Sequence, residues 1–244
     1  MKKVFLRTIT LVYYFFFLAV MSFFQPILWL FFKFFGYSGL KKTFDVVTFL
    51  SLKCSHILGC KYTFENRDFI PKNVPIIFVS NHQSLSDTVG MNWYLRRFHP
   101  AFVTKKELGK GIPSLSYYVR NGSCVMIDRN NPKQAISQIK TLSEYIEKHN
   151  RSAIIFPEGT RSKTGEPKEF AQSGLKILCK YAPSAFVVPI SINNSWKVYQ
   201  YGYFALSLGH HIFFTVHKPL KVSVFSFEEI MKRTENAIVQ GIKV

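Results

Sequence analysis

Two ionisable residues, His82 and Asp87, follow closely on the apolar run Ile76–Val79, with four residues between them. Histidine is the side chain best suited to accept a proton near neutral pH, and a carboxylate beside it can hold its ring in the required tautomer. A buried strand that ends in ionisable residues is a common way for an α/β protein to build a site. The pair therefore predicts a general base and the residue that orients it.

A second polar cluster, Phe156 to Ser162, follows another short apolar run, 153–155. It contains Arg161, and an arginine can bind a phosphate or carboxylate through two parallel hydrogen bonds. Gly159 permits the tight backbone geometry of an anion site built from amide groups. A base, an orienting carboxylate and an anion-binding arginine together predict an enzyme that acts on a phosphorylated hydroxyl compound.

These residues also have ordinary structural interpretations. A histidine after a strand can be a core or capping residue, and Asp87 could simply complement the N-terminus of a helix. Ser84 and Ser86 invite comparison with Ser-His-Asp hydrolases, but no Gly-x-Ser-x-Gly elbow surrounds either serine. The second cluster favours catalysis by His82, with both serines as capping residues or minor substrate contacts.

The pattern of apolar runs and turn residues predicts the elements that must position these side chains. Strands are expected at 62–65, 76–80, 101–104, 123–127, 153–156, 186–191 and 211–217, and helices from Ser84 or Ser86 and over 132–149, 173–181 and 227–240. Alternating strands and helices predict an α/β fold with a mixed, largely parallel sheet flanked by helices.

The N-terminal part has a different character. Residues 8–32 contain no charged side chain, and this length is sufficient to span the core of a bilayer. Basic residues flank the stretch and Pro26 is expected to break it, so one span and a shallow re-entrant hairpin or interfacial helices both remain open. With a linker helix expected over 39–60, we predict a membrane-anchoring helical segment at 1–59 and an α/β domain at 60–244.

Charge and composition indicate the kind of partner. The chain has 32 Lys and Arg against 14 Asp and Glu, a net charge of +18, which favours anionic lipid, phosphorylated substrates or nucleic acid. No zinc knuckle, ribonucleoprotein signature or basic heptad helix is present, so an anionic membrane surface is expected and nucleic acid is not. The four cysteines include no Cys-x-x-Cys pair, which predicts reduced thiols, no metal site and no cofactor.

The two clusters, in their order and spacing, resemble the lysophospholipid/glycerolipid acyltransferase family, and in particular its bacterial 1-acyl-sn-glycerol-3-phosphate acyltransferases. Asn81-His82 and Asp87 match the family's Asn-His-x4-Asp motif, and residues 156–162 match its Phe-Pro-Glu-Gly-Thr-Arg-Ser motif. Three weaker matches are Lys105–Leu108, Gly122–Arg129 and Val188–Ile190. The resemblance covers residues 60 to 220 and implies a specific reaction.

That reaction is transfer of a fatty acyl group from acyl-CoA or acyl carrier protein to the sn-2 hydroxyl of lysophosphatidic acid, which yields phosphatidic acid. The resemblance implies that His82 is the general base and that Asp87 orients it. The residues expected to bind the substrate and its phosphate are Glu158, Gly159, Thr160, Arg161, Lys105 and Arg129. The expected location is the cytoplasmic face of the inner membrane, where lipid substrate and product reside.

Two other hypotheses stay open at this point. The first keeps the chemistry and changes the acceptor to glycerol 3-phosphate, another lysophospholipid or a lyso-aminolipid. The second is a basic, membrane-bound lipid-binding protein without turnover, in which His82 would be dispensable.

Overall fold

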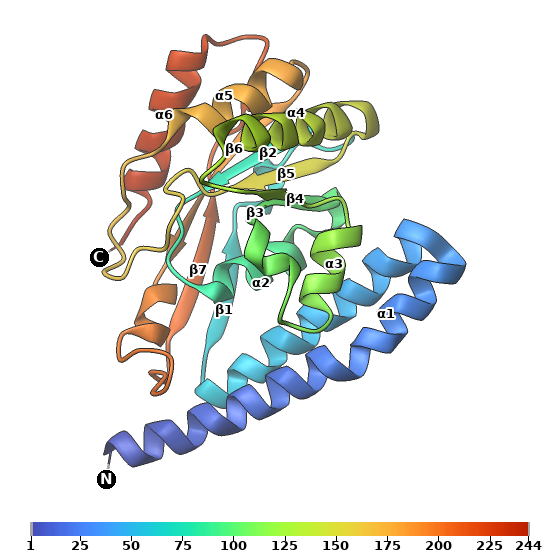
Figure 1. Ribbon diagram of the computed structural model, residues 1–244. Helices are drawn as coiled ribbons and strands as arrows, with labels where there is room; N and C mark the ends of the chain where they lie inside the picture. Colours follow the sequence, from blue (N-terminus) through green and yellow to red (C-terminus); the bar gives the residue numbers. More distant parts are fainter. Residues whose placement is uncertain (1, 244) are drawn as a thin grey trace.

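A sheet of eight strands forms the centre of the computed structural model, which describes residues 2–243 (Figure 1). The strand order is β1-β7-β6-β2-β5-β3-β4, and β8 pairs with β6. Strand β6 is antiparallel to β7 and β8, and the other pairs are parallel. The strands are β1 (Lys61–Glu65), β2 (Ile76–Ser80), β3 (Pro100–Lys105), β4 (Val125–Ile127), β5 (Ser152–Ile155), β6 (Phe186–Asn193), β7 (His211–Val216) and β8 (Leu220–Lys221).

Helices cover both faces of the sheet (Figure 1). One face carries α4 (Pro132–His149), α5 (Gln172–Tyr181) and α6 (Phe227–Gln240), and the other side holds α1 (Lys2–Cys54), α2 (Leu85–Tyr94) and α3 (Leu115–Asn121). Strand β2 is buried along its whole length. Ile77 and Val79 pack into the core with α4, α5 and α6, while Ile76 and Phe78 pack into the opposite core. The unbroken apolar run of β2 suits a parallel strand that is covered on both faces.

The expected fold class, a mixed and largely parallel sheet with flanking helices and an apolar N-terminal helix, is confirmed. The predicted strands and helices are present, with ends that differ by a few residues. Helix α3 and the short strand β8 were not predicted. The division into 1–59 and 60–244 stays a prediction, and α1 packs directly on α2 and α3.

The N-terminal segment differs from the expected arrangement. The prediction that Pro26 breaks the apolar stretch is wrong, because α1 continues through it, and the chain instead reverses at Gly36. Gly36 has φ 55° and ψ −144°, a conformation that only glycine adopts readily. The result is a hairpin of two helical arms (Figure 1), in which the expected linker helix forms the second arm.

A contact from outside α1 lies next to Pro26. Proline removes one hydrogen bond from a helix interior and crowds the preceding turn. The hydroxyl of Ser114 donates to the carbonyl of Met21 at 2.5 Å, and its backbone N–H donates to Oε1 of Gln25 at 2.5 Å. The segment before α3 thus makes polar contacts with the turn of α1 that precedes Pro26.

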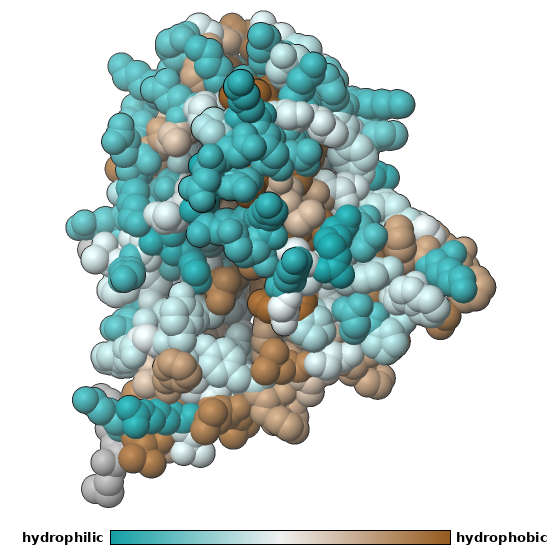
Figure 2. Space-filling view, viewed as in Figure 1, coloured by the Kyte–Doolittle hydropathy of each residue, from teal (hydrophilic) through white to brown (hydrophobic). Residues whose placement is uncertain are grey.

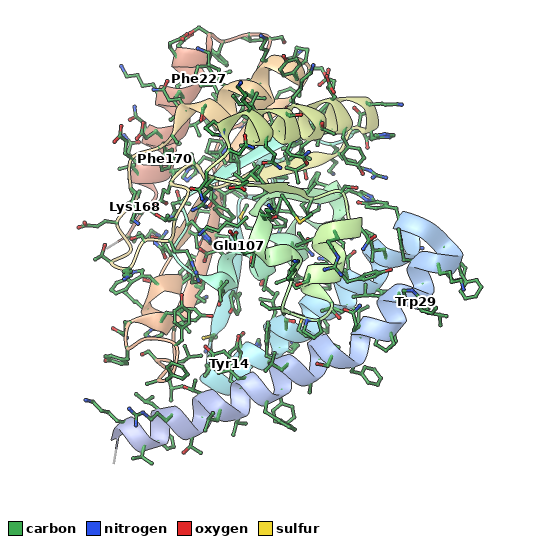
Figure 3. The ribbon with its side chains drawn as sticks, in the orientation of Figure 1. Tyr14, Trp29, Glu107, Lys168, Phe170 and Phe227 are labelled. Carbon is green, nitrogen blue, oxygen red and sulfur yellow. The ribbon has the colours of Figure 1, made fainter. Side chains whose placement is uncertain are left out.

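The exposure of α1 is unusual for a helix of this length. The segment Lys3–Leu58 is long and apolar enough to cross a membrane by length and composition, and only 11% of its most apolar window is buried. Trp29 points away from the rest of the protein (Figure 3). Brown, apolar surface lies along the lower edge of the molecule, where α1 runs (Figure 2). The hairpin therefore presents a long apolar face without a protein partner within residues 2–243.

We expect Gly36→Ala to destabilise the turn of α1. The added Cβ would meet no atom within 4 Å, so the cost is backbone strain alone, about 1–3 kcal/mol. Thermal unfolding in detergent should show a lower midpoint for this variant. Ser38→Ala, at an exposed helical position, should leave the midpoint unchanged, and equal midpoints for the two variants would contradict the conformation described for Gly36.

Candidate active site

The site begins where β2 ends and α2 begins. Ser84 is the N-cap of α2, and its hydroxyl accepts a hydrogen bond from the N–H of Ser86 at 3.1 Å. The carboxylate of Asp87, in the first turn, accepts from the N–H of Ser84 at 2.7 Å and of Gln83 at 2.6 Å. A Ser-x-x-Asp sequence favours this reciprocal capping arrangement. Local sequence therefore fixes Asp87, which is 0% exposed, at the start of the helix.

His82 is held by the same carboxylate. Its Nδ1 lies 2.9 Å from Oδ2 of Asp87, which favours the tautomer with the proton on Nδ1 and leaves Nε2 free to accept a proton. The imidazole ring also stacks on Phe156, with ring centroids 4.2 Å apart. The side chain of His82 is 16% exposed, so the ring is fixed on two sides and still reachable.

Ser195, a residue that sequence reasoning missed, completes the surroundings of Asp87 together with Gln83. The hydroxyl of Ser195 donates to Oδ1 of Asp87 at 2.5 Å, and the backbone N–H of Ser195 donates to Oε1 of Gln83 at 3.1 Å. Ser195 begins the 3-10 helix η5 (Ser195–Tyr199), just after β6. No local motif marks it, because the pairing of β2 with β6 alone brings it to Asp87.

Asn81 explains the first position of the motif. Its side chain donates to the carbonyl of Ile192 at 2.9 Å and accepts from the N–H of the same residue at 2.7 Å. This pair of bonds extends the contact between β2 and β6 by one residue beyond the strand end. The backbone that carries His82 is thereby fixed to the neighbouring strand.

The second cluster lies beside His82 because β5 is the other neighbour of β2. We call residues 156–171, between β5 and α5, the Glu158 loop. Oε1 of Glu158 accepts from the N–H of His82 at 2.7 Å, and the N–H of Ser162 donates to the carbonyl of His82 at 2.7 Å. Burial raises the pKa of Glu158, and the hydrogen bonds from the backbone N–H groups of His82 and Lys168 oppose that rise. Glu158 therefore joins the loop to the backbone of His82.

The remaining predicted residues surround this loop. Gly159 has φ 64°, and its carbonyl accepts a hydrogen bond from the guanidinium of Arg129. The hydroxyl of Thr160 lies 2.8 Å from the ammonium of Lys168, a cation on the Glu158 loop (Figure 3) that no motif indicated. The guanidinium carbon of Arg161 lies 5.9 Å from the centroid of the Tyr203 ring.

Lys105 belongs to a neighbouring strand and not to the loop. It is the last residue of β3 and is exposed. The neighbouring Lys106 forms an ion pair with Asp128 at 3.8 Å. The structure thus brings together the residues of the two clusters and Arg129, and places Lys105 at the end of a strand that pairs with β5.

A small cavity lies between the site and α1. It has a volume of about 60 Å³. Its walls are mostly apolar and aromatic, with serine hydroxyls among them, and Tyr14 reaches it from α1 toward the body of the protein (Figure 3). The lining residues include Tyr13, Tyr14, Phe17, Leu52, Tyr62, Leu85, Ser86 and Tyr199. Since Ser86 precedes Asp87, the cavity approaches the start of α2 from the side of the hairpin.

The site has no arrangement of metal ligands. Within residues 2–243 no group of three or more His, Cys, Asp or Glu side chains could hold a metal ion. The four cysteines are free thiols, and burial raises the pKa of Cys60 and Cys124 to about 11. The ionisable groups near His82 are instead the carboxylates of Asp87 and Glu158 and the surrounding cations.

With this geometry described, comparison with known proteins gives the family. The family model described as Acyltransferase matches residues 61–193, more than half of the 244-residue chain. The chain belongs to the Acyltransferase family. Both clusters lie inside the matched range of this acyltransferase, whereas the α1 hairpin and Ser195 lie outside it.

Relatives and a solved structure agree with this assignment. The chain is 36% identical over 127 residues to a 1-acyl-sn-glycerol-3-phosphate acyltransferase of Helicobacter pylori, in a match that covers 49% of the chain and 51% of the relative. A protein of the same name from Cocos nucifera is 36% identical over 121 residues, covering 50% of the chain and 38% of the relative. The matches thus span about half or less of the length of these curated relatives.

The structural similarity extends over the whole chain. The crystal structure of the 1-acyl-sn-glycerophosphate acyltransferase PlsC from Thermotoga maritima is 27% identical, with a TM-score of 0.82. The match covers 99% of this chain and 96% of that one. The expected resemblance to glycerolipid acyltransferases is confirmed.

The surroundings of Asp87 lead to a stability prediction. Asp87→Asn would place an NH2 group against N–H and O–H donors, and the lost hydrogen bonds should lower the free energy of unfolding by roughly 3 kcal/mol. Denaturant unfolding measures this change. Asp68→Asn, at an exposed position, is the matched control, and equal stability of the two variants would show that the carboxylate does not hold the site together.

Proposed function

We propose that this acyltransferase transfers a fatty acyl group from acyl-CoA or acyl carrier protein to the sn-2 hydroxyl of 1-acylglycerol 3-phosphate, which forms phosphatidic acid. The names of its relatives support the reaction. The observation that carries the proposal is the His82–Asp87 pair at 2.9 Å, held against a loop that presents Arg161. A base beside an anion-binding loop suits a substrate that has both a hydroxyl and a phosphate.

His82 and Asp87 would carry the chemical step. Nε2 of His82 takes the proton from the sn-2 hydroxyl while the hydroxyl oxygen attacks the thioester carbonyl. Asp87 stabilises the imidazolium that forms. When the tetrahedral intermediate collapses, the C–S bond breaks and the imidazolium returns its proton to the departing thiolate. This sequence needs no cofactor and no covalent acyl-enzyme, since a thiolate leaves readily.

The phosphate of the acceptor would be bound at the Glu158 loop. Arg161 is the main candidate because its guanidinium can form two parallel hydrogen bonds to phosphate oxygens. Amide groups of residues 158–160 and the side chain of Lys105 add donors, and Lys168 beside Thr160 adds a further cation. Arg129 orders the loop through the carbonyl of Gly159. Glu158 holds the loop on the backbone of His82.

The α1 hairpin would bring the site to the lipid. Its exposed side chains include Phe15, Phe23, Trp29, Phe34 and Phe35, and aromatic residues of this kind favour the membrane interface. The net charge of +18 attracts an anionic surface. The mostly apolar cavity beside Ser86 would receive part of an acyl chain. We place the protein at the cytoplasmic face of the inner membrane, where the thioester donor is available.

The test is thiol release by the purified full-length protein from acyl-CoA, with each candidate acceptor in turn. We expect release that depends on lysophosphatidic acid. His82→Ala should lower turnover by about two to four powers of ten, the loss expected for a general base. His149→Ala, at an exposed position at the end of α4, is the matched control.

Each contrary outcome identifies a different error. Near-normal turnover in His82→Ala would remove the base from the mechanism. Faster release with glycerol 3-phosphate or another lysolipid would change the acceptor. An absence of acceptor-dependent release, with lipid binding unaffected by His82→Ala, would favour the lipid-binding protein over the enzyme.

A further inference from the structure

The loop between η5 and β7 carries an aromatic cluster on the surface. We call residues 200–205 the aromatic loop, and its sequence includes Tyr201, Tyr203 and Phe204. Phe204 is 84% exposed, more than any other large apolar side chain within residues 2–243, and Tyr201 is 58% exposed. Single exposed apolar residues are ordinary on protein surfaces, but a cluster of aromatic residues on one loop indicates a binding surface.

The loop is held in place by its own hydrogen bonds. The N–H of Gly202 donates to the carbonyl of Tyr199 at 2.9 Å, and the N–H of Ser207 donates to the carbonyl of Val198 at 2.8 Å. The second bond closes the base of the loop. Phe204 is therefore presented outward by a closed turn.

The aromatic loop lies beside the first arm of α1. The N–H of Leu206 donates to the buried hydroxyl of Thr10 at 2.9 Å, which fixes the end of the loop to the first arm of the hairpin. The next residues along α1 with exposed apolar side chains are Leu11, Val12 and Phe15. Figure 1 shows this loop, in orange, next to the N-terminal end of α1. The loop thus adjoins the arm of α1 that carries these exposed side chains.

The loop also borders the candidate site. The ring centroid of Tyr203 lies 5.9 Å from the guanidinium carbon of Arg161, and Tyr199, just before the loop, lines the cavity together with Ser86. A lipid that moved from a bilayer under α1 toward Arg161 would pass this edge. A contact between the loop and the bilayer would therefore keep the entrance of the site at the lipid surface.

We propose that the aromatic loop is a second membrane-contact element, in which Phe204 enters the interfacial region of the bilayer beside α1. The proposal rests on the membrane role given to α1 under the proposed function. Three observations favour a lipid surface as the occupant. The loop adjoins the arm of α1 that carries exposed apolar side chains, its own exposed residues include tyrosines of the type enriched at membrane interfaces, and the chain carries a charge of +18. A second copy of the chain on this loop is an outcome of the test.

The experiment places an environment-sensitive thiol dye at one position in the full-length protein. In a Cys54→Ser background, Phe204→Cys is compared with Phe15→Cys on α1 and with Val224→Cys, which is 65% exposed and lies before α6. The raised pKa values of Cys60 and Cys124 slow their labelling. The Cys54→Ser protein without an introduced cysteine measures the dye signal that comes from the remaining native thiols. Vesicles of phosphatidylglycerol and phosphatidylethanolamine, with and without brominated acyl chains, are then added.

We expect a blue shift and quenching by brominated lipid at positions 204 and 15, and neither at 224. A response at 15 without one at 204 would overturn the second contact and leave the α1 anchor intact. A response at 204 without one at 15 would support the loop and refute the anchor. A blue shift at 204 that rises with protein concentration in the absence of lipid would assign the loop to a second copy and overturn the proposal.

Activity provides an independent readout. Phe204→Ser should raise the apparent KM for lysophosphatidic acid presented in vesicles by about tenfold, the loss expected when one aromatic side chain leaves the interface. Turnover of a short-chain, monomeric acceptor should be unchanged. Val224→Ser serves as the matched control. An unchanged vesicle KM in Phe204→Ser would contradict the proposal, even if the reaction itself proceeds as described.

Discussion

The buried carboxylate of Asp87 is the constraint on which the site depends. An ionised group without exposure is costly unless hydrogen bonds compensate it. Its two oxygens accept from five donors, which come from His82, Gln83, Ser84 and Ser195. These donors lie just after β2, at the start of α2 and at the start of η5. The hydrogen bonds to this one carboxylate therefore hold three segments of the chain together. The orientation of the imidazole follows from the same requirement.

The order of the strands then determines what stands next to the imidazole. Strand β2 lies between β5 and β6, so the loops that follow all three strands meet at one edge of the sheet. Asn81 connects this edge to β6, and Glu158 connects it to the loop after β5. Glu158 therefore acts through the backbone of His82. The carboxylate of Glu158 must be largely buried to join the two loops, and this burial raises its pKa.

Much of this arrangement could be predicted from local sequence, because strands buried on both faces give unbroken apolar runs and a Ser-x-x-Asp box marks the start of α2. Ser195 and Lys168 could not, since only tertiary pairing and the course of a long loop bring them to the site. The turn of α1 was misplaced for a related reason. Proline usually ends or kinks a helix, but α1 continues through Pro26, whereas Gly36 carried no signal beyond its residue type. Helix α3 was missed because it is short and is stabilised by packing on α1, as in the stacked pair Phe44 and Tyr118.

The tautomer of His82 links the buried carboxylate to the proposed chemistry. Nitrogen-15 NMR of protein labelled at histidine can determine it directly, with the His82 signals assigned by their loss in His82→Gln. In the neutral form of His82 we expect the proton on Nδ1, facing Asp87, and an unprotonated Nε2 that can accept a proton from a hydroxyl. A neutral His82 with its proton on Nε2 would contradict the role of Asp87 and leave the site without its base.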